Sequence, residues 1–313
     1  MTRRPKLLSS EQVTQAIAEF KIDDWANLDY AKVDEYATAL DNYFITKFGF
    51  VFHTVRTSNT NKLIGKVYRV RKFNKSINGN LIAEFSHPPA SLTKNIQRAN
   101  LPYHPVFYGA PSAHTALLET LSQTFEADGK NLYFLSEWEF RKDQPIYVTP
   151  FIYGEYDKVD AYNQMAAKGV AQFKKEIPDL TEDESASIDA VFKMFSSLFE
   201  YEHTHAISGY LGHRHLYFPG NVRSDLLIYP SIQTDKRTLN YAFHPNAVIH
   251  KLMLKRIFLF GINKYDLNKE TGKAEVSFAI QDRLGINNDH GYLIWRNLPE
   301  EDEQDFKELF PAK

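Results

Sequence analysis

The hydrophobic positions near the start of the chain follow a helical period. Over residues 30–48 the apolar side chains recur at intervals of three and four residues, which builds one stripe along a helix. Gly49 follows as the residue expected to end that helix in a left-handed conformation. A shorter helix, capped by Ser9 or Ser10, is expected to run to Phe20. Residues 1–48 therefore predict an N-terminal helical extension.

Beyond Gly49 the pattern changes to short runs rich in Val, Ile, Phe and Tyr, which is typical of β-strands. Strands are predicted at 50–56, 63–71, 105–108, 131–140, 145–150, 225–230, 240–244, 252–262, 274–280 and 292–295. Helices are predicted from Ser112, over 157–176 and after the capping box that begins at Thr181, whereas 74–96 and 203–219 are predicted to be loops or turns. Residues 299–310 are expected to form a solvated helix or to fray. The mixture predicts an α/β (α+β) fold.

Composition narrows the classes of function. The net charge of -2 and the pI of about 6.6 argue against nucleic acid as the main partner. The chain has no cysteine, which excludes thiol catalysis, disulfides and cysteine-ligated zinc and fits a reducing compartment. No apolar segment after the first arginines is typical of a secretion signal, and no apolar run is long enough to cross a bilayer. We therefore expect a cytoplasmic globular protein with no membrane partner.

Candidate chemistry gathers in residues 97–125. Arg98 precedes a strand that contains Tyr108, and the helix that follows carries Glu119 at the edge of its apolar stripe. A guanidinium, an aromatic ring and a carboxylate in one small volume suit a ligand with phosphates and a sugar. Alternation along 63–71 points Arg69 and Arg71 to the same side. Spacing alone favours the plainer alternative, an ion pair between Arg98 and Glu119 at the core edge, with Tyr108 as ordinary strand packing.

The common sequence motifs for nucleotide binding, nucleophilic catalysis and metal binding are absent or incomplete. No GxGxxG motif follows a strand, and neither a P-loop nor a GxSxG nucleophile motif is present. Two HxH pairs could hold a metal if each pair lay on one face of a strand. Their members are His203, His205, His213 and His215. No carboxylate or cysteine completes a metal-binding signature, so surface or hydrogen-bonded histidines are the favoured interpretation and no metal site is predicted.

Four short segments stand in a characteristic order. They are VYRV at 67–70; RAN at 98–100 with PVFYG at 105–109; TALLE at 115–119; and LIYPS at 227–231 with NYAFHP at 240–245. In this order they resemble the YR, GRWN, tAlaE and YPS motifs of the RES-domain family, the toxin half of many bacterial toxin–antitoxin pairs. The resemblance covers about residues 63–262. Ala99 in place of the family's Trp, the lack of a glycine before Arg98, and long inserts at 72–97 and 155–215 depart from the pattern.

The resemblance implies an ADP-ribosyltransferase-like fold, in which a split β-sheet core with helical inserts holds NAD in a cleft. We therefore divide the chain into the extension 1–48, a RES-like NAD-binding catalytic domain 49–298 and an acidic tail 299–313. The implied activity is an NAD glycohydrolase or phosphorylase, which cleaves the nicotinamide–ribose bond with water or phosphate as acceptor. NAD is then the substrate and no cofactor is expected. A protein antitoxin is the implied partner, and a homo-oligomer is left open.

The resemblance also assigns residues. It makes Glu119, Arg69 and Ser231 catalytic, and it places NAD against Arg69, Arg98, Asn100, Tyr108 and Ser231. Loss of nicotinamide develops positive charge on the ribose, as in glycoside hydrolysis, and an ionised Glu119 can stabilise that charge. The arginines can bind pyrophosphate oxygens, and Ser231 can hydrogen-bond Glu119 or the ribose. Two alternatives stay open: an ADP-ribosyltransferase that modifies a macromolecule, and a catalytically inactive nucleotide-binding module.

Overall fold

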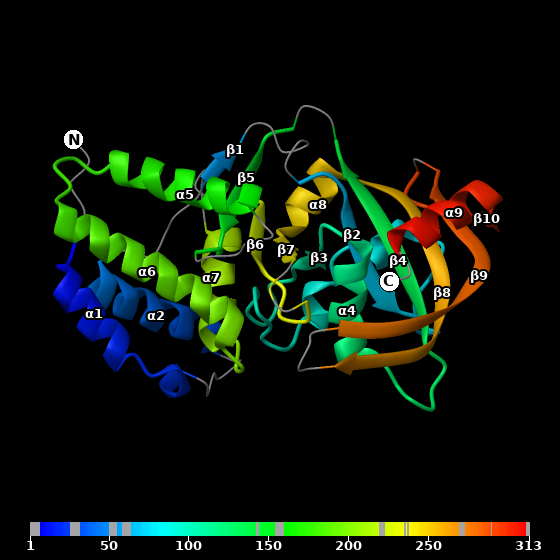
Figure 1. Cartoon of the computed structure of the whole chain (residues 1–313), viewed down its shortest axis with the longest axis horizontal. Helices are drawn as coiled ribbons and strands as arrows, with labels where there is room; N and C mark the ends of the chain where they lie inside the picture. Colours follow the sequence, from blue (N-terminus) through cyan, green and yellow to red (C-terminus); the bar gives the residue numbers. More distant parts are fainter. Residues whose placement is uncertain are drawn as a thin grey trace. The chain divides into compact units, whose positions relative to one another are not determined.

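A computed structural model describes most of the chain as two compact units (Figure 1). The described residues are 7–25, 32–49, 55–57, 64–141, 144–153, 160–218, 223–234, 236, 238–268, 273–288 and 290–310. The first unit comprises Met1–Thr57, Pro89–Val106 and Ile146–Pro230, and the second comprises Ser58–Pro88, Phe107–Pro145 and Ser231–Lys313. Helices and strands mix in both units, which confirms the predicted α/β class.

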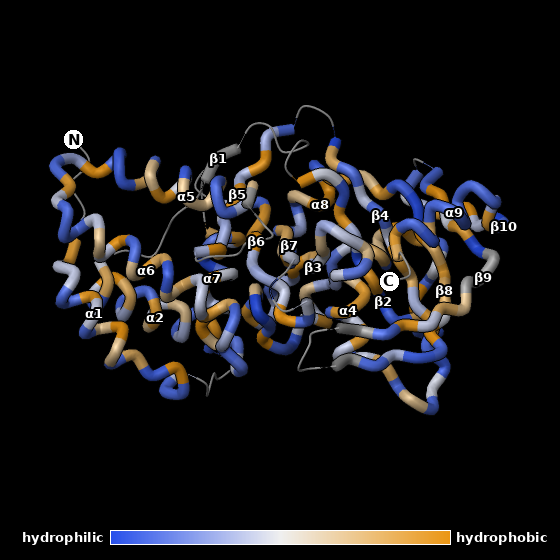
Figure 2. The backbone as a smooth tube through the Cα atoms, in the orientation of Figure 1, coloured by the Kyte–Doolittle hydropathy of each residue, from blue (hydrophilic) through white to orange (hydrophobic). Residues whose placement is uncertain are grey.

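The first unit is built mainly from helices. They are α1 (Ser10–Glu19), α2 (Val33–Phe48), α5 (Asp160–Lys175), α6 (Glu182–Tyr201) and α7 (Ala206–Tyr217), with 3-10 turns η1 (Ile22–Trp25) and η4 (Ala90–Leu92). Strand β1 (Val55–Thr57) pairs antiparallel with β5 (Ile146–Pro150), and β5 pairs parallel with β6 (Leu226–Pro230). Helix α1 lies against α2 and α6, and orange apolar positions alternate with blue polar ones along α6 in Figure 2, as expected for a helix with one buried face.

Local caps set the helix ends where the sequence predicted them. The Ser9 hydroxyl accepts a hydrogen bond from the Gln12 amide in a capping box at the start of α1. Thr181 begins α6 in the same way. Gly49 ends α2 at a φ of 83°, a conformation that favours glycine. Caps and helical periodicity were therefore a reliable guide to these three helices of the first unit.

The predicted turn-rich stretch at 203–219 is wrong, because most of it forms helix α7. The Glu202 carboxylate accepts the backbone N–H groups of Ile207 at 2.8 Å and Ser208 at 2.7 Å. These bonds satisfy amides that a helix start leaves open. The Glu202 carboxylate thus caps α7 from outside the helix. The sequence did not indicate this cap, because the glycines and histidines of the segment are typical of turns.

The glycines of α7 serve close packing. A Cβ atom added at Gly212 would lie 2.5 Å from the carbonyl oxygen of Ala99, and one at Gly209 would lie 2.8 Å from that of Gln97. The helix therefore lies directly against the tight turn that carries Arg98. Ala99, which stands where the RES pattern has a Trp, is fully buried in this contact.

The second unit is built on an antiparallel sheet. Its strands, in the order β10-β9-β8-β4-β2, are β10 (Leu293–Asn297), β9 (Lys273–Asn287), β8 (Leu252–Asn268), β4 (Leu132–Phe140) and β2 (Val67–Lys72). A short ladder joins β3 (Phe107–Gly109) to β7 (Leu239–Phe243), and Ala110 bridges Tyr68 of β2. The helices are α4 (Ala113–Thr124), α8 (Pro245–Lys251) and α9 (Glu300–Leu309), with the 3-10 turn η3 (Ile82–Phe85). Strands β8 and β9 are longer than predicted, and residues 50–54 of the first predicted strand lie outside the described residues.

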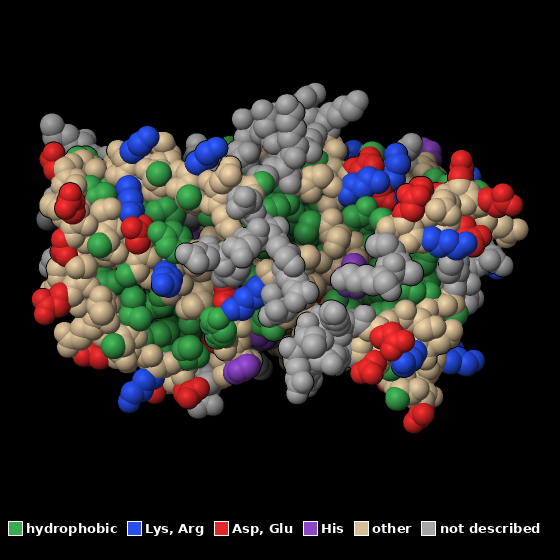
Figure 3. Space-filling view, in the orientation of Figure 1, with side chains coloured by type: hydrophobic (Ala, Val, Ile, Leu, Met, Phe, Trp, Pro, Cys, Tyr) green, Lys and Arg blue, Asp and Glu red, His purple; other side chains and the backbone are tan. Residues whose placement is uncertain are grey.

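Helix α9 is not a solvated tail. The helix itself was predicted, but Phe306 is 2% exposed and its ring lies 5.2 Å from that of Phe258 and 5.5 Å from that of Phe260, between ring centroids. These residues belong to the same apolar cluster as the buried face of α4. The acidic composition of 299–310 hid this apolar contact. Charged side chains gather over α9 on the face drawn in Figure 3, whereas hydrophobic ones gather there over α2 and α6.

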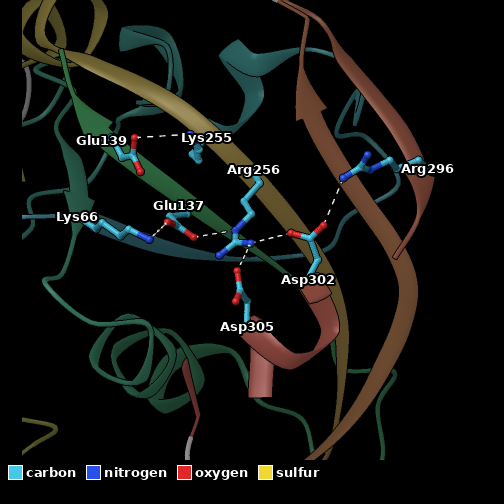
Figure 4. Close-up of polar contacts among 8 residues, drawn as sticks. All are labelled: Lys66, Glu137, Glu139, Lys255, Arg256, Arg296, Asp302 and Asp305. Carbon is cyan, nitrogen blue, oxygen red and sulfur yellow. Dashed lines mark hydrogen bonds and ion pairs between the residues drawn. The ribbon is translucent and has the colours of Figure 1, made fainter. Parts of the chain in front are cut away.

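An ion-pair network ties α9 to the sheet (Figure 4). Glu137 of β4 is buried and accepts Lys66 Nζ at 2.5 Å and Arg256 Nε at 2.9 Å. Arg256 Nη1 donates to Asp302 and to Asp305 of α9, each at 2.7 Å. Because the guanidinium bridges three carboxylates, it neutralises charge that would otherwise be buried between sheet and helix.

Candidate functional site

Glu119 lies in the second turn of α4, at the edge of its buried stripe. The helix begins at Ser112, whose hydroxyl accepts the Thr115 amide at 3.2 Å. The residues that follow bury Leu117 and Leu121, which leaves Glu119 partly accessible beside the core. The position predicted for this carboxylate is confirmed.

Two side chains donate hydrogen bonds to one oxygen of Glu119. Ser231 Oγ donates to Oε1 at 2.6 Å, and Asn240 Nδ2 donates to the same atom at 2.8 Å. Both donors are buried. Within the described residues Oε2 accepts no hydrogen bond, so the carboxylate is held on one side and has a second oxygen available. The expected bond between Ser231 and Glu119 is present. Asn240 was missed as a site residue, although it opens the last segment of the resemblance.

A chain of hydroxyl groups fixes the loop that carries Ser231. Ser112 Oγ and Thr115 Oγ1 are 2.8 Å apart, and Thr115 Oγ1 donates to Thr238 Oγ1 at 2.8 Å. Thr238 and Thr234 hydroxyls are also 2.8 Å apart, and Thr234 Oγ1 donates to the Ser231 carbonyl at 3.2 Å. The start of the Glu119 helix and the Ser231 loop are thus fixed by the same bonds.

Tyr265 of β8 is a further polar group in this neighbourhood. Its hydroxyl oxygen is buried and has no hydrogen-bond partner among the described residues. Burial, and secondly the charge of Glu119, raise the pKa of Tyr265, which keeps the phenol protonated. Its ring packs edge-on against Phe125, the residue that ends α4, with 5.6 Å between ring centroids. Sequence reasoning missed this residue, which lies beyond the predicted end of its strand.

Arg69 of β2 carries a buried positive charge. Its guanidinium lies 4.9 Å from the centre of the Phe107 ring. Although the residue as a whole stays partly accessible, Nη1 is buried and makes no hydrogen bond within the described part of the chain. Burial and the neighbouring Arg71 lower the pKa of Arg69 to about 10. Such a group is satisfied best by an anionic ligand.

Tyr108 of β3 is a neighbour of Arg69. An electrostatic interaction with Tyr108 opposes the lowering of the Arg69 pKa, so the two side chains are near each other. The register pairs Tyr108 with Ala242, and since alternate residues of a strand share a face, Tyr108 faces the same side as Asn240. Arg69 itself points to the face of β2 opposite Val70, which packs on α4. Direct convergence of Arg69 and Glu119 on one ligand therefore stays a prediction.

His87 is a second neighbour of Arg69 that the sequence did not indicate. It comes from the predicted loop at 74–96 and is half-buried. Burial, and then the charge of Arg69, lower the pKa of His87, which keeps its ring neutral near pH 7. Its Nδ1 is 3.1 Å from the Ser86 hydroxyl. The insert therefore contributes a polar ring beside the buried guanidinium.

Arg98 and Asn100 lie in the first unit, where each has a structural role. Arg98 Nη1 donates to the carbonyl of Phe199 in the last turns of α6, where a helix leaves carbonyls open. Asn100 is buried and its Nδ2 donates to the carbonyls of Asn95 at 3.3 Å and Leu101 at 3.0 Å. Their assignment to NAD stays a prediction.

The second histidine pair does not take the strand arrangement that the metal-binding alternative would require. His213 and His215 lie on helix α7, where residues two apart point in different directions. Burial lowers the pKa of His215 to about 4, although its Nδ1 is 2.7 Å from the Leu211 carbonyl. His213 packs on His104 with 4.3 Å between ring centroids. In the part of the chain that the structure describes, no group of three or more His, Asp or Glu side chains could hold a metal ion.

A pocket of about 490 Å³ lies in the first unit between α5 and α6. Its charged groups already satisfy one another, because Asp189 accepts the Tyr153 hydroxyl at 2.8 Å and pairs with Lys174 at 2.6 Å. None of the predicted site residues lines it. The Glu119 carboxylate on α4 is therefore the better candidate for the functional site.

No helix of the described residues has the length and apolar character that a membrane span needs.

The mixed fold makes this an α/β protein with a hydrogen-bonded carboxylate on α4, and comparison with known proteins narrows this class to a family. The model of the RES domain matches residues 66–255, more than half of the chain. The protein therefore belongs to the RES-domain family, as the sequence motifs predicted. This family is associated with toxin–antitoxin systems, and its members are generally enzymes that act on NAD. No curated protein matches the chain.

Proposed function

We propose that the protein cleaves NAD between nicotinamide and ribose and passes the ADP-ribosyl group to water or phosphate. The observation that carries this proposal is the Glu119 carboxylate, fixed on Oε1 by Ser231 and Asn240 with Oε2 left to a ligand. Membership of a family of NAD-acting enzymes supplies the substrate class.

In this reaction the bond from the ribose C1′ to the nicotinamide nitrogen breaks, and nicotinamide leaves with the bonding electron pair. Positive charge develops on C1′ and the ring oxygen, and the negative charge of Glu119 stabilises it. Water or phosphate then bonds to C1′, and the proton that water loses is accepted by a nearby base. Oε2 of Glu119 is suited to orient a ribose hydroxyl or the attacking water. Ser231 and Asn240 hold the carboxylate so that little reorganisation precedes the reaction.

Arg69 and Tyr108 would bind the rest of NAD. A buried guanidinium with an open donor fits a pyrophosphate oxygen, and the Tyr108 ring offers a stacking surface to nicotinamide or ribose. An antitoxin protein would be the partner that controls such an activity in the cell.

The test is release of nicotinamide from NAD by the purified protein, compared with Glu119→Gln. This substitution keeps the shape and removes the charge, and it is expected to lower the rate by about 10²–10³. Glu126→Gln is the matched control, because Glu126 follows the same helix but pairs at the surface with Lys72 at 2.7 Å; its rate should be unchanged. No release by the wild type, or equal release by Glu119→Gln, would remove the proposal.

The reaction products distinguish water from phosphate as the acceptor, and they also test the two alternative functions. Free ADP-ribose indicates water, and ADP-ribose 1-phosphate formed in phosphate buffer indicates phosphate. Label from NAD retained on a macromolecule would favour an ADP-ribosyltransferase. Tight NAD binding without turnover would favour an inactive nucleotide-binding module.

A further inference from the structure

We propose that Tyr265 is a ligand-binding residue of the Glu119 site, and that its phenol donates a hydrogen bond to a hydroxyl of the bound sugar. This inference rests on the proposed function and extends it. Tyr265 lies beyond residues 66–255, the part of the chain that matches the RES domain.

A β-bulge directs Tyr265 toward α4. Phe258, Phe260 and Ile262 alternate along β8 and belong to the apolar cluster that holds the buried face of α4. Continued alternation would place Lys264 on that face. The pairing of β8 with β9 shifts register between Ile262 and Lys264, and Tyr265 then packs against the cluster instead. Bulges next to binding sites often redirect a side chain in this way.

The Tyr265 hydroxyl serves ligand binding and adds nothing to the packing of its ring. The Tyr265 ring is held against Phe125, yet its hydroxyl is buried without a hydrogen-bond partner among the described residues. A phenylalanine would pack equally well and would avoid an unsatisfied polar group. The Tyr265 hydroxyl is thus a buried donor without a partner among the described residues, and it lies within the electrostatic reach of Glu119. This combination indicates that the missing partner is a ligand atom.

The chemistry of the two groups defines that atom. Glu119 Oε2 only accepts hydrogen bonds, and the protonated Tyr265 has a hydrogen to donate. A hydroxyl group can donate to the first and accept from the second, whereas a phosphate oxygen can only accept and would be repelled by the carboxylate. The sugar hydroxyls of an ADP-ribosyl group are therefore the expected partners.

The test compares binding of ADP-ribose and of ADP by calorimetry. ADP-ribose requires no turnover, and ADP lacks the second ribose. Tyr265→Phe is expected to weaken ADP-ribose binding about tenfold, the usual effect of losing one hydrogen bond in a closed site, and to leave ADP binding unchanged. Tyr133→Phe is the matched control. Tyr133 lies in the same apolar cluster, but its hydroxyl already accepts a hydrogen bond from Thr124 at 3.4 Å, so it needs no ligand partner. The affinities of this variant for ADP-ribose and for ADP should both stay as in the wild type.

A second measurement uses the wild-type chain and keeps the inference testable if the variant folds poorly. ADP-ribose should change the near-ultraviolet absorbance of a tyrosine in the wild type and also in Tyr108→Phe, in which Tyr265 is unaltered, and ADP should change neither. Unchanged ADP-ribose binding by a folded Tyr265→Phe, an equal loss for ADP, or no absorbance change with ADP-ribose would overturn the inference. If nicotinamide release fails while ADP-ribose still depends on Tyr265, then the proposed reaction is wrong but the sugar site stands.

Discussion

The ion-pair network around Arg256 allows a prediction about the stability of the fold, which does not depend on the proposed reaction. Arg256→Met keeps the side-chain stem and removes the guanidinium. Glu137, whose side chain is 1% exposed, would then keep only Lys66 as a charged partner among the described residues, and Asp302 would lose its bond at 2.7 Å. The variant therefore leaves buried negative charge poorly compensated between the sheet and α9.

The expected magnitude follows from how deeply each partner is buried. Removal of one member of a buried pair destabilises proteins by about 3–5 kcal/mol. Lys66 is half exposed and still reaches Glu137, and the Asp305 side chain is 51% exposed and adds little. We therefore expect a loss of about 3 kcal/mol in the free energy of unfolding.

The assay is urea denaturation of Arg256→Met beside Lys255→Met. Lys255 is the neighbouring cation on β8, but it is exposed and lies 3.9 Å from Glu139, so its loss should change stability by less than about 1 kcal/mol. Hydrogen exchange should locate the weakening of Arg256→Met in α9, and adding Glu137→Leu should recover part of the stability. Equal stability of the two single variants would refute the reasoning.

Two further predictions concern single side chains. Ser231→Ala should lower the rate of nicotinamide release roughly tenfold with little change in KM, because Asn240 is then the one donor left to Glu119 in the described part of the chain; an unchanged rate would contradict this role. His215 keeps a folded pKa of about 4, below its ordinary 6.5, so the stability it contributes is present above pH 6.5 and is lost as pH falls toward 4, by up to about 1.4 kcal/mol per pH unit. The urea midpoint of His215→Phe should therefore fall less steeply between pH 7 and pH 5 than that of the wild type, and equal slopes would contradict the assignment.

The sequence predicted best the features that depend on near neighbours. The helix that carries Glu119 follows from the Ser112 cap and the spacing of its apolar residues, and the contact with Ser231 came from the ordered RES motifs. The N-terminal helices followed from caps and periodicity in the same way. The caps and periodicities lie within a few residues of the elements that they predict, whereas the Ser231 contact joins residues 112 apart and came only from the family resemblance.

Features that depend on distant contacts were missed. Helix α7 owes its start to the Glu202 carboxylate and its glycines to the adjoining turn, so propensity alone indicates a loop. Phe306 is one buried position in an acidic helix. Tyr265 depends on a bulge, which no local pattern announces.

The hydroxyl chain beside the site can exist in only one orientation. Each hydroxyl has a single hydrogen to give, and Thr234 gives its hydrogen to the Ser231 carbonyl. Thr238 must then give to Thr234, Thr115 to Thr238, and Ser112 to Thr115. Every dipole along the row is aligned, and each bond strengthens the next. A valine at Thr115 would divide this row in two, so the loop would loosen at a distance from the altered residue.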